Sequence, residues 1–496
     1  MRRHIGACLI AALAWTSPPQ AIAAAPAGAP PVLAPSPARG VFLSLSDLHF
    51  DPFARPALVP LLDRSPVRDW ARIFSADADG APSGTGADSN YALMMSTLKA
   101  AAGAGVRYDY VVHSGDFLAH DFQYGYQRSA GPAPRGYADF VIKTMTFIGM
   151  QMRATLGEVP IYGSAGNNDA ICGNYMIEPD SALLKAMALQ WGKLAGQPGR
   201  LADFTVGGYY KVPHPTVKNH DLIILNDIFW STQYQNACGA GKGDPGTAQM
   251  DWLAWQLYQS QMRGRTATLV MHIPPGINGY SVSRAPSTCG GAMPSFWRRE
   301  YGDAFLALLA RFRPVVGASL AGHTHMDDFR VLSDAGGKPY FMTHVTPSIS
   351  PFFGNNPSFS FIEYDRETAA FSNYAVFVKG GADARGTSSW GLEYVFSQAY
   401  GQDNAGPAGV QAVAGAIRTS EAARGSFIRY YAGDARGGSS ITKDNWRAYS
   451  CAHDNLTQTA YAACYCPPPS STGGISPDPT PSGAPTAGPP DRRTPG

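Results

Sequence analysis

The chain has no polybasic run, no Cys-x-x-Cys pair, no internal repeat and, beyond its first residues, no apolar stretch long enough to cross a bilayer. The last absence excludes a bundle of transmembrane helices, because each helix would need ~20 apolar residues. The 39 basic and 37 acidic residues give a formal net charge of +2. Without a basic cluster, no nucleic-acid-binding surface is indicated.

The length of the chain exceeds that of one ordinary domain. Its 496 residues, 45% of them hydrophobic, can build a large core, whereas single domains have roughly 100–200 residues. The ends are rich in Ala, Pro, Gly and Ser, a composition that cannot bury enough apolar surface to fold. We predict a signal peptide over 1–25, a disordered leader over 26–39, a catalytic α/β domain over 40–381, a helical C-terminal subdomain over 382–466 and a disordered tail over 467–496.

The first residues have the pattern of an export signal. A basic start, Arg2 to His4, precedes an apolar stretch from Ile5 to Trp15 and a small-residue cleavage site near Ala23. The alternative, a single membrane anchor, is disfavoured because the stretch is shorter than ~20 residues. We therefore expect a secreted or periplasmic protein.

The cysteines favour disulfides over a metal site. Once the segment with Cys8 is removed, an even number remains, which predicts up to three disulfides with fifteen possible connectivities. These are Cys172, Cys238, Cys289, Cys451, Cys464 and Cys466. A cysteine zinc site is disfavoured because the paired spacing is missing.

Short apolar runs alternate with helical patterns between the two ends, which predicts an α/β fold. Strands are expected over 41–46, 108–113, 159–163, 222–225, 267–271 and 315–321, and helices over 91–102, 137–156, 181–194, 248–262 and 296–312. From Lys338 the pattern changes to strands (341–345, 359–364 and 370–377), which we expect to form a second sheet packed on the first. Helices over 408–416 and 421–431 are expected in the smaller C-terminal subdomain.

Polar side chains follow five of the predicted strands. They are Asp47 and His49, Asp116, Asn167 with Asn168, His272, and His323 with His325. The carboxyl ends of strands in α/β sheets meet at one crevice, so these side chains should converge. Oxygen and imidazole donors without thiolates suit zinc, manganese or iron. The neighbouring glycines would allow the backbone to turn sharply.

The order Asp-x-His, Gly-Asp, Gly-Asn-x-Asp, a lone His and Gly-His-x-His resembles the calcineurin-like metallophosphoesterases. The resemblance implies a four-layer fold, two packed β-sheets flanked by helices, and a centre of two divalent ions, with zinc favoured and manganese or iron as alternatives. It implies that one ion is bound by Asp47, His49, Asp116 and His325. It implies that the other is bound by Asp116, Asn167, His272 and His323.

Further segments resemble the acid sphingomyelinase-like phosphodiesterases within that superfamily. They are Gly115 to Asp121, His272 to Gly276, Thr346 to Pro351 and Asn356 to Phe359. The resemblance implies hydrolysis of a phosphodiester by a hydroxide that the two ions activate. The expected substrate is a sphingomyelin-like lipid, a nucleotide or a phosphocholine-type ester, with possible peripheral membrane contact.

The chain departs from the superfamily at Asn168, where a histidine is usual. Asparagine can donate a hydrogen bond but cannot transfer a proton at neutral pH, and Asn168 is a candidate catalytic residue in that limited sense. We therefore predict His120 as the general acid, because the pKa of histidine lies near the working pH. The alternative is that His120 only orients Asp116 or Asp121.

Two other functions are compatible with these residues. A phosphomonoesterase of the purple acid phosphatase kind is disfavoured, because Leu118 to His120 offer no tyrosine where that group has a metal ligand. A non-catalytic metal- or phosphate-binding protein has Asn168 as its only support. Among the remaining histidines, His113 is expected either in the core or in a supporting position behind the ligands. His214, His220 and His453 are expected at the surface, and the sequence gives no indication of oligomeric state.

Overall fold

The computed structural model describes residues 33, 35–77, 80–130, 136–199, 201–236, 243–285, 289, 291–382, 388–435 and 439–466. The predicted signal peptide, most of the leader and the tail lie outside these residues. The last residues of the predicted leader are described, and Arg39 already begins the first strand.

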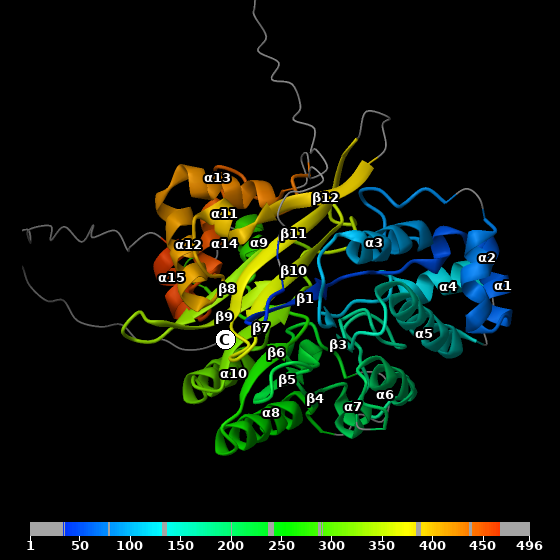
Figure 1. Cartoon of the computed structure of the whole chain (residues 1–496), viewed down its shortest axis with the longest axis horizontal. Coiled ribbons are helices and arrows are strands. Elements are labelled where there is room, and N and C mark those ends of the chain that lie inside the picture. The colour runs from blue at the N-terminus through cyan, green and yellow to red at the C-terminus, as the bar shows by residue number, and fades with distance from the viewer. Residues whose placement is uncertain are drawn as a thin grey trace, which may run out of the picture.

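Two six-stranded mixed sheets form the centre of the molecule (Figure 1). The first has the order β12 (Ser388–Val395), β11 (Phe371–Ala382), β10 (Ser358–Asp365), β1 (Arg39–Leu45), β2 (Val111–His113) and β3 (Ile161–Gly163). The second has the order β4 (Tyr210–Pro213), β5 (His220–Ile224), β6 (Thr266–Val270), β7 (Val316–Ala321), β9 (Pro339–Val345) and β8 (Asp328–Ser333). β1, β2 and β3 are parallel to one another, as are β5, β6, β7 and β9.

The two sheets pack face to face, and the alternation of side chains along β5 shows how. Leu222 and Ile224 lie in the same core cluster as Val111 of the first sheet. Ile223 and Leu225 lie in a second cluster on the opposite face. Because neighbouring side chains of a strand point to opposite faces, one apolar strand supplies both layers of core.

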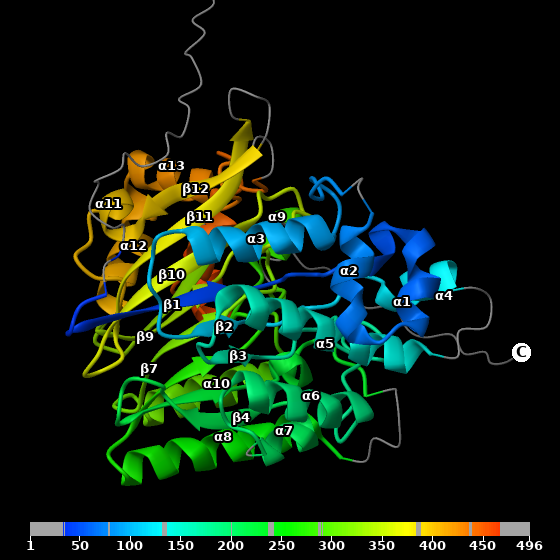
Figure 2. The same ribbon diagram turned by 45° about the vertical axis from the view of Figure 1, so that its right-hand side comes forward.

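Helices cover the outer faces of both sheets (Figure 2). α3 and α5 contribute to the core of the first sheet, and α8 and α10 to the outer core of the second. The helices are α1 (Val59–Arg64), α2 (Trp70–Ser75), α3 (Tyr91–Gly103), α4 (Phe122–Ala130), α5 (Tyr137–Leu156), α6 (Ala182–Leu194), α7 (Ala202–Gly207), α8 (Pro245–Met262), α9 (Gly279–Arg284), α10 (Arg299–Arg311), α11 (Phe396–Tyr400), α12 (Pro407–Thr419), α13 (Glu421–Tyr430), α14 (Trp446–Ala452) and α15 (Gln458–Tyr465). Capping side chains determine where several helices begin. The Asn90 side chain accepts a hydrogen bond from the Leu93 N–H at the start of α3, and the Ser181 side chain accepts one from the Leu184 N–H at the start of α6.

The predicted fold class, two packed sheets flanked by helices with a mainly helical C-terminal part, is confirmed by this topology. The predicted composition of the second sheet is wrong. Of the late strands, β10 and β11 join β1 in the first sheet, and β9 joins β7 in the second. β12, which lies beyond the predicted boundary at 381/382, pairs with β11, so residues 382–466 begin inside the first sheet.

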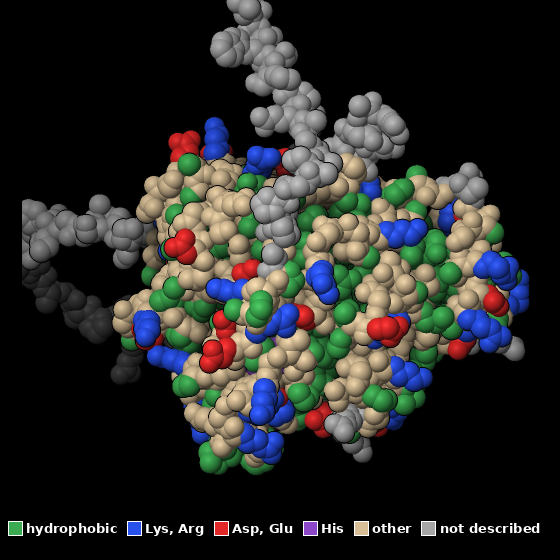
Figure 3. Space-filling model, viewed as in Figure 1, with side chains coloured by type: hydrophobic (Ala, Val, Ile, Leu, Met, Phe, Trp, Pro, Cys, Tyr) green, Lys and Arg blue, Asp and Glu red, His purple; other side chains and the backbone are tan. Residues whose placement is uncertain are grey.

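The C-terminal helices pack beside β8 and β9, where they form the orange-to-red group of Figure 1. Two disulfides, Cys289–Cys466 and Cys451–Cys464, hold the end of this part, and Cys172 is disulfide-bonded as well. No described helix is long and apolar enough to cross a membrane. On the face shown in Figure 3, basic and acidic side chains are interspersed.

The expected surface position of three histidines is wrong. His214, His220 and His453 have exposed fractions of only 6%, 3% and 0%. Their ring nitrogens lie beside polar partners inside the protein: His220 contacts Thr266 and Thr268 hydroxyls at 2.7 and 2.9 Å. His113 is buried in β2 as expected.

Candidate metal centre

All predicted ligand segments leave the carboxyl ends of parallel strands at one edge of the sheet pair. Asp47 and His49 follow β1, Asp116 follows β2 and Asn167 follows β3, all from the first sheet. His272 follows β6, and His323 and His325 follow β7, from the second sheet. The structure brings the seven side chains together as two groups, with Asp116 between them.

The first group is Asp47, His49, Asp116 and His325. His49 Nε2 lies 3.0 Å from His325 Nε2, 3.4 Å from Asp116 Oδ2 and 3.8 Å from Asp47 Oδ1. His49 Nδ1 lies 3.0 Å from the Leu118 carbonyl oxygen. A carbonyl can only accept, so Nδ1 carries a hydrogen and Nε2 is the ring nitrogen that faces the group.

The second group is Asp116, Asn167, His272 and His323. Asn167 Oδ1 lies 3.0 Å from His272 Nε2 and 2.9 Å from His323 Nδ1. The amide is oriented by its Nδ2, which donates to Asn174 Oδ1 at 2.7 Å. His272 Nδ1 donates to the Ser114 carbonyl at 2.6 Å, which leaves Nε2 facing Asn167 and, at 3.3 Å, Asp116 Oδ2.

Asp116 Oδ2 is thus the atom shared by both groups, and Asn168 holds this carboxylate. The backbone N–H of Asn168 donates to Asp116 Oδ1 at 2.8 Å, and its side-chain Nδ2 donates to Oδ2 at 2.9 Å. From the sequence, Asn168 is a candidate catalytic residue. In the structure its amide is hydrogen-bonded to Asp116, and we interpret it as a positioning residue.

The backbone at the site is unusual at the predicted ligands themselves. Asp47, His49, Asp116, His323 and His325 all have positive φ, between 44° and 71°. Such conformations are uncommon for residues other than glycine and are concentrated at functional sites.

At the glycines next to the predicted ligands, the missing side chain mainly leaves room for neighbouring atoms to pack closely, and only in one case does it permit an unusual backbone turn. A Cβ at Gly322 would lie 1.9 Å from Ser46 Oγ and 2.5 Å from Asp47 Oδ2. Only Gly115 combines such closeness with a left-handed φ, of 88°. Gly166, beside Asn167, has no positive φ either, so the structure shows close packing at Gly166 and Gly322 and a left-handed conformation at Gly115.

The carboxylate and imidazole side chains of the two groups shift one another's pKa values. Burial alone would raise the pKa of Asp116, but His272 and His49 beside it hold it well below its usual range. Against the effect of burial, Asp116 raises the pKa of His49 to about 9 and that of His272 to about 10. Burial lowers the pKa of His323 to about 4 and that of His325 to about 3.

These residues fit divalent cations. Imidazole nitrogens, all buried except those of the half-buried His323, converge with carboxylate and amide oxygens at hydrogen-bond distance, and two of the closest atoms, His49 Nε2 and His325 Nε2, are both ring nitrogens. The donors are the oxygen and imidazole types that zinc, manganese and iron accept. The carbonyl partners of His49 and His272 supply the outer support typical of metal-binding histidines.

His120 lies at the edge of the first group. Its ring stacks on His49 at 4.1 Å between centroids and on Phe352 at 4.4 Å. Its Nδ1 lies 3.0 and 3.1 Å from the two oxygens of Asp88, whose Oδ2 also accepts from the His120 backbone N–H. The His120 ring is therefore held by Asp88, and among the described residues it makes no hydrogen bond to Asp116 or Asp121, the two aspartates that His120 orients in the alternative prediction.

Sequence reasoning missed several supporting residues. Asp88 stands in a loop without a recognisable motif, so nothing in the sequence marked it. Asp169 accepts from the backbone N–H groups of Asp116, Phe117, Leu118 and Gly166. Asp227 accepts from the N–H groups of His272 and Ile273. Asp169 belongs to the Gly-Asn-x-Asp segment, which was the available signal for it.

Comparisons with known proteins agree with the resemblance. Residues 339–466 match the family model "Acid sphingomyelin phosphodiesterase C-terminal region". The chain is 24% identical over 414 residues to human "Acid sphingomyelinase-like phosphodiesterase 3b", covering 79% of this chain and 82% of that protein. It is 25% identical over 446 residues to human "Cyclic GMP-AMP phosphodiesterase SMPDL3A", covering 87% and 91%.

The similarity to acid sphingomyelinase-like metallophosphoesterases is thereby confirmed. Among solved structures, a dimetal phosphatase from Danio rerio matches with 13% identity and a TM-score of 0.39, covering 71% of this chain and 98% of that one. A score this low supports no inference about the site.

Proposed function

We propose that the protein is an exported, metal-dependent phosphoric ester hydrolase that cleaves phosphodiesters. One observation carries the proposal: five segments from two sheets bring seven donor side chains into two groups that share the Asp116 carboxylate. The printed names of the relatives, which are phosphodiesterases, support this class of reaction.

The two groups would each hold one divalent cation, with zinc favoured and manganese or iron accepted by the same donors. Cations in such a pair supply Lewis acidity and activate water for in-line displacement at phosphorus. The residues of the chain contribute orientation: Leu118 and Ser114 carbonyls fix the rings of His49 and His272, and Asn168 fixes Asp116. Their burial keeps bulk water from competing for these bonds.

We propose His120 as the group that donates a proton to the leaving oxygen. Its Nδ1 is held by Asp88, and Nε2 has no hydrogen-bond partner among the described residues. The His120 ring is stacked between the rings of His49 and Phe352, which restricts its orientation. A fixed ring next to the first donor group supports this proposal, because a general acid must be held within reach of the bond that breaks.

The proposed export and the proposed class of substrate are supported by the sequence and by the relatives together. Export agrees with the basic and apolar start of the chain and with the disulfides, which persist in oxidising compartments. The substrate is a small phosphodiester, such as a sphingomyelin-like lipid, a nucleotide or a phosphocholine-type ester. Peripheral contact with a membrane belongs to the lipid version of this proposal.

The test is a comparison of bis-nitrophenyl phosphate with nitrophenyl phosphate, using purified protein before and after chelation. We expect faster cleavage of the diester, loss of activity with chelator and recovery with zinc or manganese. Faster cleavage of the monoester would favour the phosphomonoesterase alternative. Metal binding without turnover of either ester would favour a binding protein and contradict the proposal.

A further inference from the structure

A cavity of about 460 Å³ opens beside the second donor group and has no assigned role. His323 and Phe296 belong to its lining, and their rings lie 5.7 Å apart. A group attached to a phosphate at the donor groups would therefore extend into this cavity. Its opposite wall includes Tyr431, Ser440 and Tyr449, from the C-terminal part of the chain.

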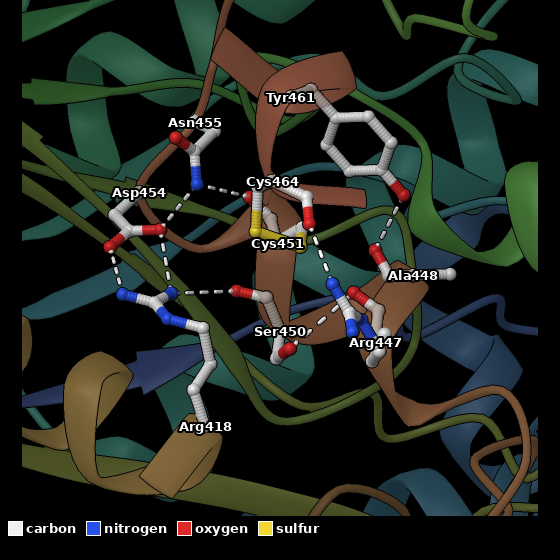
Figure 4. Close-up of a disulfide and its surroundings, with 9 residues drawn as sticks. All are labelled: Arg418, Arg447, Ala448, Ser450, Cys451, Asp454, Asn455, Tyr461 and Cys464. Carbon is white, nitrogen blue, oxygen red and sulfur yellow. Dashed lines mark hydrogen bonds and ion pairs between the residues drawn. A yellow bond between two sulfur atoms is a disulfide. The ribbon is translucent and has the colours of Figure 1, made fainter. Parts of the chain in front are cut away.

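This wall is held rigidly. α9 and α14 approach so closely that a Cβ at Gly279 would lie 2.8 Å from the Ala448 carbonyl oxygen. Tyr449 Oη donates to Ser440 Oγ at 2.9 Å. Figure 4 shows the Cys451–Cys464 disulfide between α14 and α15, with the Arg418–Asp454 ion pair next to it. The cavity is thus a preformed space and not a gap between loosely joined parts.

Arg330 lines the cavity and has more donors than partners. It is 2% exposed, and its Nη1 donates to Asp328 Oδ2 and to the Phe329 carbonyl, both at 2.7 Å. Its Nε is buried and has no hydrogen-bond partner among the described residues. A guanidinium offers five N–H donors, and no hydrogen bond among the described residues uses Nη2, so the Nη2 donors, rather than the enclosed Nε, remain for an acceptor in the cavity.

Asp328 is the only carboxylate among the described lining residues, and its charge is already balanced. Its Oδ2 pairs with Arg330, and its Oδ1 accepts from the Phe329 N–H at 2.8 Å and lies 3.1 Å from His453 Nε2. Aromatic walls alone would suit a quaternary ammonium group. A cation would also lie near the guanidinium, which repels it, so the cavity has no net electrostatic preference for a cation.

We infer that this cavity is a substrate subsite that selects an uncharged group bearing a hydrogen-bond acceptor, which pairs with Arg330, over a quaternary ammonium group. The inference rests on the proposed phosphodiesterase function and narrows its substrates, because it disfavours the sphingomyelin-like and phosphocholine-type esters, which carry a quaternary ammonium group, relative to the other small phosphodiesters. Aromatic side chains such as Tyr280 and Phe353 pack against the body of that group, and the Arg330 N–H groups bind its acceptor oxygen.

The test uses three 4-nitrophenyl phosphodiesters that share one leaving group. Their second alcohols are N-acetylethanolamine, which carries a carbonyl acceptor, choline, and 3,3-dimethylbutanol, the uncharged isostere of choline. We expect kcat/KM for the acetamidoethyl ester to exceed that for the dimethylbutyl ester by about 10- to 100-fold, the range of one hydrogen bond to a charged donor. The choline ester should be no faster than its isostere.

In the Arg330→Met variant, the ratio of kcat/KM for the acetamidoethyl ester to that for the dimethylbutyl ester should fall to near unity. The kcat/KM for the choline ester should rise relative to that for its isostere, because Asp328 loses its balancing charge. The matched control is Arg313→Met, an Asp-paired but exposed arginine, in which all ratios should match the wild type. A buried carboxylate left unpaired can unfold the variant. The Asp328→Asn/Arg330→Met double variant removes both charges and should still lose the acetamido preference.

The wild-type ratios alone can overturn the inference, without any variant. A choline ester that is faster than its isostere, or equal rates on all three esters, would contradict the subsite while leaving the phosphodiesterase function intact. No turnover of any of the three esters would contradict both. An acetamido preference that persists in the folded double variant would remove Arg330 from the explanation.

Discussion

Replacing Asp88 with asparagine tests how the proposed proton donor is positioned. Asp88 is 7% exposed, and its oxygens accept from the His120 backbone N–H at 2.8 Å, from His120 Nδ1 at 3.0 Å and from Ser350 Oγ at 3.0 Å. Burial raises its pKa, but His120 lowers it further, to below the usual range, so the pair is charge-assisted. In Asp88→Asn an NH2 group replaces one oxygen, and the His120 ring loses a charged acceptor.

The magnitude follows from that lost bond. A hydrogen bond to a charged group contributes ~1.5–3 kcal/mol, which corresponds to about 10- to 100-fold in rate. His120→Ala, which removes the proton donor itself, should cost ~10²–10⁴-fold. Both losses should be confined to esters with a poor, alkoxide leaving group, because nitrophenolate leaves without protonation.

The assay is kcat/KM for an alkyl phosphodiester and for bis-nitrophenyl phosphate, in wild type and variants. Asp109→Asn is the matched control: Asp109 accepts from Tyr364 Oη and pairs with Arg366 at 2.8 Å, but it precedes β2, whereas the site follows that strand. It should change the rates on both esters equally or not at all. Equal losses on both esters in Asp88→Asn and His120→Ala would refute the assignment of His120.

Three further predictions concern metal affinity, stability and pH. Asn168→Ala removes the side-chain bond to Asp116 and should weaken metal binding by about 10- to 100-fold in a metal titration, whereas unchanged affinity would contradict its positioning role. The Cys451→Ser/Cys464→Ser variant opens a loop with a sequence separation of 13 and should lower the free energy of unfolding by about 3 kcal/mol in urea; an unchanged midpoint would contradict this. Burial lowers the pKa of His220 to about 3. The unfolded chain therefore binds the proton first, and the stability that neutral His220 provides is present above pH 6.5 and is lost as the pH falls towards 3. The stability difference between wild type and His220→Gln should shrink by up to about 1.4 kcal/mol per pH unit below 6.5, and a constant difference would rule this out.

The positions of the strands and of the site could be predicted because both depend on local patterns. The apolar runs before Asp47, Asp116 and His272 mark buried strands, and parallel strands end at a common edge. The pairing of the late strands could not be predicted in this way. β9 and β10 have similar apolar compositions, and only long-range packing decides that one joins β7 and the other β1.

The three misplaced histidines show a second limit. Polar residues without a motif are usually exposed, which made the surface the natural expectation for His214, His220 and His453. Each is buried because partners from distant segments satisfy its ring or lie against it: Tyr110 Oη lies 3.1 Å from His214 Nε2, and the Phe329 ring stacks on His453 at 4.2 Å. No local pattern records such partners, and the same holds for Asp88 beside His120.

The most direct test of the shared metal centre is the metal content of the purified protein by mass spectrometry, in wild type, His325→Ala and Asp116→Ala. Because His325 belongs to one donor group and Asp116 to both, we predict about two divalent ions per chain in the wild type, about one in His325→Ala and fewer than one in Asp116→Ala. An active wild-type protein without bound metal, or an Asp116→Ala protein that still holds two ions, would contradict the account.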